Sequence, residues 1–375
     1  MSTPIDKLID NTIRADVRDI ASYFVPDASG YIKLDAMENP YQLPEGLRAE
    51  LGQRLAEAAL NRYPVASYAT LKQKICVGLG VPAGYDVLLG NGSDELISIM
   101  AMAVARQDGQ RAVVMAPTPA FVMFARSAQF AGADFVGVPV KSDFSLDLPA
   151  MLAAIEEHKP ALLFLAYPNN PTGNLFDADD MVAIIRALGE TGIAVVDEAY
   201  QPFAKKSFMD RLPEFPNLVV MRTLSKLGLA GIRLGYLSGD PKLLEQFEKV
   251  RPPYNVNVLT QVAAEFALDH LDVLDEQAEL LNAERSRLAA ELAALPGVEV
   301  FPSAANFISM RVPDAEKACA DLRAGKVLIR NLGKMDKMLA NCIRVTVSTP
   351  EENTAFLTAL KASLQQRSPD SGATP

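Results

Sequence analysis

Two side chains in this sequence offer chemistry that a protein core rarely tolerates. Lys226 follows the apolar run Leu218–Met221, and Asp197 directly follows the run IAVV at 193–196. A lysine after a strand is usually a solvated charge, but one removed from water has a lowered pKa and forms Schiff bases. An acid after a buried strand is costly unless it has a partner. Facing a ring nitrogen, Asp197 would keep that nitrogen protonated, and a pyridinium is an electron sink; alone, Asp197 fits a turn cap equally well.

The segment GNGSDE (90–95) has the composition of an anion-binding loop. Gly90, Gly92 and Ser93 stand at the predicted start of a helix, where glycine lets the backbone approach a ligand and free N–H groups favour an anion. The segment lacks the third glycine of a dinucleotide fingerprint, and the sequence has no Gly-Lys-Ser/Thr loop. On its own, it fits a simple turn equally well, with Ser93 or Asp94 as a helix cap.

The elements that must position these residues alternate along the first two thirds of the chain. Nearly continuous apolar runs of strand length indicate strands buried on both faces of a sheet; they span Asp86–Gly90, Ala112–Ala116, Phe135–Val140, Ala161–Tyr167, Ile193–Val196 and Leu218–Met221. Segments of helical spacing separate them, among them Asp94–Arg106, Leu148–His158 and Ala178–Glu190. This alternation predicts an α/β domain with a mostly parallel sheet.

Polar sequences follow four of the predicted strands: GNGSDE, YPNNPTG, DEAY and RTLSK. In an open α/β sheet, ligands bind at the carboxyl ends of the strands. The polar sequences are therefore expected to converge on one crevice.

The pattern changes after about residue 255. Gln261–Leu295 is predicted to form one long or two shorter helices, followed by strands at Val298–Phe301, Asn306–Arg311 and Cys342–Val347 and a last helix from Glu351 to about Gln365. We therefore expect an N-terminal arm (1–45) joining a small α+β domain (256–367), a large α/β domain (46–255) between them, and a disordered tail (368–375).

Composition excludes several classes of protein. Of 375 residues, 49% are hydrophobic and 22% charged, which is typical of a globular protein, and the formal net charge is −10. No basic run suits nucleic acid or a membrane surface, and we expect neither a secretory signal nor a membrane span. Three scattered cysteines without metal-ligand spacing predict free thiols in a reducing cytoplasm and no metal site.

The motifs and their order along the chain also resemble those of a known enzyme family. The chain resembles the fold-type I, aspartate-aminotransferase-like enzymes that use pyridoxal 5′-phosphate (PLP), and within them the histidinol-phosphate aminotransferase branch. The matching motifs run in order over nearly the whole chain: MENPY (37–41), LNRYP (60–64), GNGSDE (90–95), PNNPTG (168–173), VVDEAY (195–200), RTLSK (222–226), AGIRLGY (230–236), ANF (305–307) and IRVTV (343–347).

The resemblance implies a role for each matching residue around PLP. Lys226 resembles the lysine that holds PLP and then moves the substrate proton, Asp197 the partner of the pyridinium nitrogen, and Asn170 and Tyr200 the donors to the phenolic oxygen. Phe121 stands where the family usually has a ring-stacking tyrosine. The residues that resemble phosphate anchors are Gly92, Ser93, Asp94, Thr223, Ser225 and Arg233, together with Tyr63 from the second subunit of a homodimer.

One phosphate anchor departs from the family pattern. The family commonly places this arginine eight residues after the lysine, whereas Arg233 follows Lys226 by seven. The loop is one residue shorter, and Gly228 would supply the tighter turn. A surface arginine is the alternative interpretation.

For the substrate, Arg344 resembles the arginine that binds an anionic tail. In the histidinol-phosphate branch that tail is a phosphate, with Arg330, Tyr23 and Asn39 as expected additional contacts; an arginine fork suits phosphate and carboxylate alike. The alternative for Arg330 and Tyr23 is a surface pair beside the domain junction. The resemblance therefore implies a cytoplasmic, homodimeric enzyme for small molecules that transaminates histidinol phosphate with 2-oxoglutarate in histidine biosynthesis.

Three other functions stay open from the sequence. Two keep the fold and change the chemistry: an aromatic-amino-acid aminotransferase, and a threonine-phosphate decarboxylase, which breaks a different bond at the substrate Cα. The third is a non-catalytic PLP-binding regulator, which the absence of a basic patch disfavours.

Overall fold

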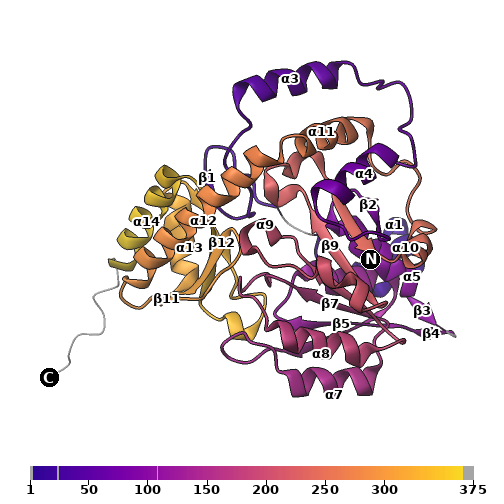
Figure 1. The fold of residues 1–375 in the computed structure, drawn as a ribbon. Helices are drawn as coiled ribbons and strands as arrows, with labels where there is room; N and C mark the ends of the chain where they lie inside the picture. Colours follow the sequence, from indigo (N-terminus) through magenta and orange to yellow (C-terminus); the bar gives the residue numbers. More distant parts are fainter. Residues whose placement is uncertain (1–2, 23–24, 108, 366–375) are drawn as a thin grey trace.

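The computed structural model of the chain describes residues 3–22, 25–107 and 109–365. A large α/β body holds most of the first 250 residues, and a smaller body, orange to yellow in Figure 1, holds the C-terminal part. The predicted disordered tail (368–375) lies outside the described residues, and the last described element is the helix α14 (Pro350–Gln365).

The large body is built on a seven-stranded sheet in the order β2-β10-β9-β8-β7-β5-β6. All pairings are parallel except those of β10, which runs antiparallel to both β2 and β9. The strands are β2 (Asp86–Gly90), β5 (Val113–Thr118), β6 (Asp134–Pro139), β7 (Leu162–Ala166), β8 (Ile193–Asp197), β9 (Leu218–Thr223) and β10 (Gly235–Gly239). The predicted fold class is confirmed, and β10 is the strand that the prediction missed because GYLSG is not an apolar run.

Helices cover both faces of this sheet because successive strand residues point to opposite sides. The core on one face contains Val196 and Val220, and the helices over it are α4 (Ala69–Gly78), α7 (Leu148–His158), α8 (Ala178–Leu188) and α11 (Val258–Leu268). The core on the other face contains Val195 and Val219, under α5 (Ser93–Val104), α6 (Val122–Ala131) and α10 (Pro241–Glu248). The sheet is thereby buried apart from its edge strand β6, of which only Val138 is buried, and the strand ends are the places left for polar side chains.

The small body packs helices on a four-stranded sheet of order β11-β12-β15-β14. The strands are β11 (Glu299–Val300), β12 (Phe307–Arg311), β14 (Arg330–Asn331) and β15 (Cys342–Thr346), and the helices are α12 (Leu271–Ala293), α13 (Ala315–Ala324) and α14 (Pro350–Gln365). The predicted helical stretch 261–295 is thus two helices, of which α11 packs with the core of the large body and α12 contributes to both cores. The predicted domain boundary at residue 256 stays a prediction.

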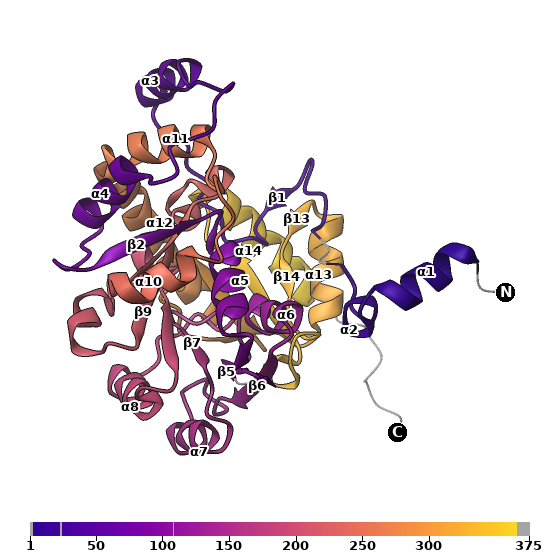
Figure 2. The same cartoon turned by 90° about the vertical axis from the view of Figure 1, so that its right-hand side faces the viewer.

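The N-terminal arm touches both bodies. Its strand β1 (Ile32–Lys33) pairs with β13 (Val327–Leu328) of the small body, whereas Arg14 donates to the carbonyl oxygens of Gln129 and Phe130 on α6 of the large one. The helix α1 (Pro4–Thr12) extends away from the rest of the molecule in Figure 2, beyond α2 (Ala15–Arg18). Helix α3 (Glu45–Ala56) stands off at the top of Figure 1 and buries none of its residues.

Short elements complete the fold. They are the hairpin β3 (Arg106–Gln107) and β4 (Gln110–Arg111), the helix α9 (Gln201–Ala204) and the 3-10 turns η1 (Met209–Glu214), η2 (Ser225–Leu227), η3 (Ala230–Ile232) and η4 (Lys337–Leu339). None of the helices within the described ranges is long and apolar enough to span a bilayer.

Candidate active site

A cavity of about 220 Å³ lies at the carboxyl ends of the sheet strands, where the arm passes over them. This volume is below the roughly 300–1,000 Å³ of pockets for drug-sized ligands, so it suits one small substituted ring. The predicted residues that line it come from the ends of five strands and the loops that follow them: Ser93, Asp94, Phe121, Asn170, Asp197, Tyr200, Thr223, Ser225, Lys226 and Arg233. The expected convergence of these sequences on one crevice is what the structure shows.

Lys226 lies in the turn η2, directly after β9, and its side chain reaches under the arm. Its Nζ donates to the carbonyl oxygen of Ala36 at 3.1 Å and lies 5.7 Å from the centre of the Tyr200 ring. Burial lowers the pKa of this ammonium to about 8, and the positive charge of Arg344 acts in the same direction. A solvated surface lysine is therefore the wrong interpretation, and roughly a tenth of Lys226 is the neutral, nucleophilic amine at pH 7.

Asp197 ends β8 at the floor of the cavity and is 6% exposed. Its Oδ1 accepts the Ala199 N–H at 3.0 Å, so the carboxylate does cap the following turn, as the alternative interpretation expected. Burial raises the pKa of Asp197 to about 7, against the lowering effect of that hydrogen bond. A positive charge placed next to this buried carboxyl group would stabilise its ionised form.

Asn170 and Tyr200 form a polar wall that continues into the small body. The Asn170 Nδ2 donates to the Tyr200 Oη at 3.1 Å, and the Asn170 Oδ1 accepts from Arg344 Nη1 at 2.7 Å. Arg344 also donates through Nη2 to the Asp35 carbonyl oxygen at 3.1 Å and is 7% exposed. Arg344 does not itself line the cavity, but it joins the cavity wall to strand β15 through Asn170.

The loop before α5 forms a cradle with Arg233 over it. Gly92 is the N-cap of α5, with φ +83°, and among the described residues no side chain caps this helix. Neither Ser93 nor Asp94 therefore has the capping role that the alternative interpretation gave it. A Cβ on Gly92 would lie 2.5 Å from Arg233 Nη2, and Arg233 also approaches the Asp94 carboxylate at 3.6 Å. The cradle thus needs glycine at position 92, and the shortened loop still brings Arg233 to the cavity.

Thr223 and Ser225 extend the cradle toward Lys226. The Thr223 Oγ1 lies 2.9 Å from the Ser225 Oγ and donates to the Leu234 carbonyl oxygen at 3.0 Å. Gly228, with φ +115°, supplies the tight turn that the shorter loop requires. On the opposite wall, Phe121 packs edge-on against Phe124 at 5.7 Å, which fixes the orientation of an aromatic ring at the cavity.

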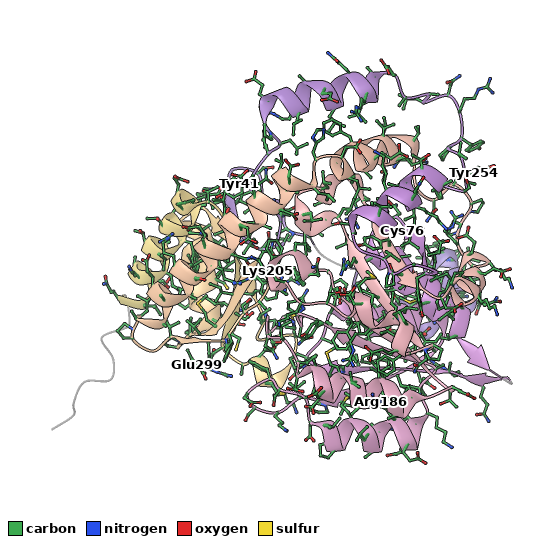
Figure 3. The ribbon with its side chains drawn as sticks, viewed as in Figure 1. Tyr41, Cys76, Arg186, Lys205, Tyr254 and Glu299 are labelled. Atoms are coloured by element: carbon green, nitrogen blue, oxygen red, sulfur yellow. The ribbon has the colours of Figure 1, made fainter. Side chains whose placement is uncertain are left out.

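The predicted site residues Asn39 and Tyr63 do not line the cavity. The Asn39 amide donates to Gln277 Oε1 at 2.9 Å and to the Leu227 carbonyl oxygen at 3.3 Å, so it braces the loop beside Lys226 instead of facing a substrate. Tyr63 is 81% exposed and stacks on Tyr254, with 4.6 Å between ring centres. Tyr254 is labelled in Figure 3, where it lies at the periphery of the large body. Tyr23 lies outside the described residues.

Arg330 and Arg344 are directly opposite each other on the antiparallel strands β14 and β15. Opposite residues of such a pair share one face of the sheet, with Cβ atoms about 4.5–5.5 Å apart, and like charges there are destabilising. Arg330 is partly buried and does not line the cavity. The pair nevertheless concentrates positive charge beside Asn170.

The sequence prediction missed the arm residues that close the cavity, namely Ala36, Met37 and Glu38. Met37 has φ +53°, and its backbone is held by Thr346 Oγ1 and by Asn306 Nδ2, at 2.9 and 3.0 Å. This left-handed residue turns Glu38 and the Ala36 carbonyl toward the large body. The motif MENPY marked the segment, but no local pattern indicates which of its residues face inward. No cluster of acidic, His or Cys residues fit for a metal ion occurs in the described chain.

Comparison with known proteins agrees with this geometry. The family model for aminotransferase class I and II matches residues 29–360. The chain is 63% identical to histidinol-phosphate aminotransferase 2 of Cupriavidus pinatubonensis, over 97% of this chain and 100% of that protein. It is 60% identical to histidinol-phosphate aminotransferase 1 of Ralstonia nicotianae, over 96% of each.

A solved structure extends the likeness to three dimensions. Histidinol-phosphate aminotransferase of Sinorhizobium meliloti, determined in complex with pyridoxal-5′-phosphate, superposes with a TM-score of 0.84 at 26% identity, over 94% of this chain and 98% of that one. The sequence relatives, the matched residues and the sheet with its cavity all agree, and this chain belongs to the class I and II aminotransferase family.

Proposed function

We propose that this chain is a PLP-dependent aminotransferase that transfers the amino group of histidinol phosphate to 2-oxoglutarate, giving imidazole acetol phosphate and glutamate, or catalyses the reverse reaction. The observation that carries the proposal is one small cavity that holds a half-buried lysine, a buried carboxylate, an amide–hydroxyl pair and a helix N-terminus. These groups match the aldehyde, ring nitrogen, phenolic oxygen and phosphate of PLP. Relatives that share about 60% of its residues are histidinol-phosphate aminotransferases.

The residues present fit PLP in their chemistry. Gly92 has a φ of +83°, a conformation that residues with a Cβ rarely adopt, so the cradle needs glycine there. The first N–H groups of a helix have no intrahelical acceptor, so an anion is favoured at this end of α5. Because Asp94 carries a carboxylate that pairs with Arg233, it would contribute its N–H and not its side chain. We assign the ring nitrogen to Asp197, the phenolic oxygen to Asn170 and Tyr200, and the ring face to Phe121. The phosphate would be held by Ser93, Thr223, Ser225 and Arg233, together with the N–H groups at the start of α5.

Bound PLP supplies an electron sink for the pair of electrons left when the substrate Cα loses its proton. Asp197 maintains that sink by holding the proton on the ring nitrogen. Lys226 would hold the cofactor through its Nζ, and the same amine, when free, would move the proton at the substrate Cα. Because burial lowers its pKa to about 8, roughly a tenth of the amine is neutral at pH 7.

The substrate tail is assigned to the arginines on β14 and β15. A phosphate monoester carries close to two negative charges at pH 7 and has three acceptor oxygens. One guanidinium does not satisfy these, whereas a carboxylate is satisfied by a single bidentate arginine. The opposed pair Arg330 and Arg344 therefore supports a phosphate, with Arg344 central and Arg330 as the second cation.

Kinetics of Arg330→Ala test this assignment. We expect kcat/KM for histidinol phosphate to fall by roughly 10²-fold, about 2–3 kcal/mol, with little change in the half-reaction with phenylalanine. An equal loss with both substrates would make Arg330 a structural residue. The parent enzyme should be offered histidinol phosphate, phenylalanine and threonine phosphate separately with 2-oxoglutarate. Brisk phenylalanine turnover without histidinol phosphate turnover would move the assignment to the aromatic aminotransferases, and loss of carbon dioxide from threonine phosphate would move it to the decarboxylases.

We also propose that the enzyme is a cytoplasmic homodimer with shared active sites. Exposed apolar residues lie on α1 and on the segment after α3, among them Ile5, Leu8, Leu60, Tyr63 and Val65, and such groups of residues mark interaction surfaces. Tyr63 would reach the phosphate of the second subunit. Mixing Lys226→Ala chains with Tyr63→Ala chains should restore part of the activity, because one mixed site then holds both residues; a monomer active at high dilution contradicts the proposal.

A further inference from the structure

Glu95 lies one residue beyond the cradle and turns its carboxylate away from the cavity, back under the loop. Its Oε2 accepts the Asn91 N–H at 2.6 Å and the Asn255 Nδ2 also at 2.6 Å. Glu95 is the third residue of α5, the position from which a glutamate normally reaches back to the N-cap N–H. Here the N–H of the N-cap, Gly92, already donates to the Gly90 carbonyl oxygen at 2.8 Å. The carboxylate therefore binds one residue earlier and closes the loop on itself.

Asn255 ties this closed loop to the edge of the sheet. Strand β2 is the outermost strand beside β10, and Asn255 Nδ2 donates to the Leu89 carbonyl oxygen at 3.2 Å as well as to Glu95. The Asn255 Oδ1 is itself held by Arg251 Nη1 at 2.5 Å and by the Tyr68 hydroxyl at 3.3 Å. Tyr68 is buried, so the amide has a fixed orientation.

The fit at the cradle leaves little tolerance for movement of this loop. A Cβ at Gly235 would be 2.7 Å from the Ser93 nitrogen and 2.8 Å from the Gly92 carbonyl carbon, so the backbone of the loop packs directly on β10. A misplacement of about 1 Å at such a site is costly. A second carboxylate beside Asp94 also opposes anion binding by its charge. The contribution of Glu95 must therefore come from the hydrogen bonds it accepts.

We propose that Glu95 and Asn255 are positioning residues that hold the 90–94 loop in the shape that binds the PLP phosphate. The proposal rests on the proposed function, since it names PLP. Neither residue lines the cavity, so each acts through the backbone of the loop. Both hydrogen bonds end on a single oxygen of Glu95, and a glutamine amide oxygen, with two lone pairs, accepts both.

The experiment measures the affinity of the apoprotein for PLP and for pyridoxal, which keeps the ring and the aldehyde but lacks the phosphate. Glu95→Ala should weaken PLP binding by roughly 10–100-fold, because charged hydrogen bonds to the loop are lost, and change pyridoxal binding less than about twofold. Glu95→Gln should stay within about threefold of the parent for both ligands. Asn255→Ala removes one donor and leaves the Asn91 bond intact, so we expect about a tenfold loss for PLP alone.

The matched control is Glu245→Ala, an exposed glutamate on α10, for which both affinities should be unchanged. Equal losses for PLP and pyridoxal would overturn the proposal, as would a Glu95→Gln variant as weak as Glu95→Ala, or no loss in Asn255→Ala. If Glu95→Ala does not fold, Glu95→Gln and Asn255→Ala decide. A parent that fails to bind PLP contradicts the proposed cofactor instead, and a parent that binds PLP without turning over histidinol phosphate contradicts only the proposed substrate.

Discussion

Two carboxylates stand next to each other at the end of β8, and their surroundings differ completely. Glu198 is 1% exposed, and its Oε2 accepts from Arg222 Nε at 2.8 Å and from Ser207 Oγ at 2.9 Å, while its Oε1 accepts the Phe208 N–H at 2.5 Å. Asp197 accepts one hydrogen bond, from Ala199, among the described residues, and lines the cavity. Consecutive strand residues point to opposite faces, so one acid is enclosed in structure and the other faces the cavity.

The same contrast holds for the cations beside them. Arg222 donates to Glu198, to Ser207 Oγ at 2.7 Å and to the Leu79 carbonyl oxygen at 3.1 Å, which ties β9 to the end of α4. Lys226 has a carbonyl oxygen as its hydrogen-bond acceptor and a pKa lowered by burial. A buried ion with several partners is held in one place by them, whereas an ion with few partners that faces a cavity is available for chemistry. At the ends of β8 and β9, neighbouring residues of similar charge thus have structural or reactive roles according to their partners and not according to their type.

The largest effect is expected for Lys226→Ala. Loss of the amine removes both the attachment point and the base, so turnover should fall on the order of 10⁴-fold or more while the fold is retained. Borohydride reduction of the parent, followed by peptide mapping, should place the PLP adduct on Lys226. An adduct on Lys205 or Lys206, or the absence of any adduct, would contradict the assignment of Lys226 as the reactive lysine.

Breaking the buried pair Glu198–Arg222 is expected to lower the stability of the fold. Glu198→Gln leaves Arg222 buried without a charged partner, so we expect the free energy of unfolding to fall by about 3–5 kcal/mol, as for other broken buried pairs. Urea unfolding of the apoprotein measures this loss. The double variant Glu198→Gln with Arg222→Met should recover part of it. A Glu198→Gln variant as stable as the parent would contradict the structural role assigned to Glu198.

Asp197→Asn should show the opposite pattern. The amide cannot stabilise a charged pyridinium nitrogen, so turnover should fall about 10²–10³-fold, roughly 3–4 kcal/mol, while PLP is retained. Because the substitution removes a poorly paired buried carboxylate, the apoprotein should unfold at the same temperature as the parent or higher. Steady-state kinetics and thermal unfolding of the same preparation check both parts; near-normal turnover would make Asp197 a structural cap.

The pH dependence of apoprotein stability gives the finest comparison. The pKa of Asp197 is raised by burial from 3.8 to about 7, so the folded state binds this proton more tightly than the unfolded chain. The contribution to stability is fully present below about pH 4 and is lost as pH rises toward 7, by about 2–4 kcal/mol. Unfolding of the parent between pH 4.5 and 7.5 should show this decline relative to Asp197→Asn, and identical slopes would contradict it.

Prediction from the sequence worked where the signal was local. Strands β2 and β8 and helix α7 were found within a residue because a buried strand is a continuous apolar run and α7 keeps helical spacing between Asp147 and Lys159. Strand β10 was missed because Gly235, Ser238 and Gly239 interrupt its apolar run. The sequence prediction named Asn39 as a substrate contact, whereas Glu38, one residue earlier, lines the cavity. The left-handed backbone of Met37 changes which side chains of the arm face inward.

The sequence by itself determined the alternation of strands and helices, the polar sequences at the strand ends and therefore the group of residues that meets at the cavity. Periodicity records burial along each element, so these features need no knowledge of distant neighbours. The tertiary structure decided what crosses between elements: the arm residues Ala36–Glu38 over Lys226, Arg330 opposite Arg344, and Asn255 against Glu95. These contacts join residues far apart in the chain, and their geometry depends on how whole elements pack, which no local pattern encodes.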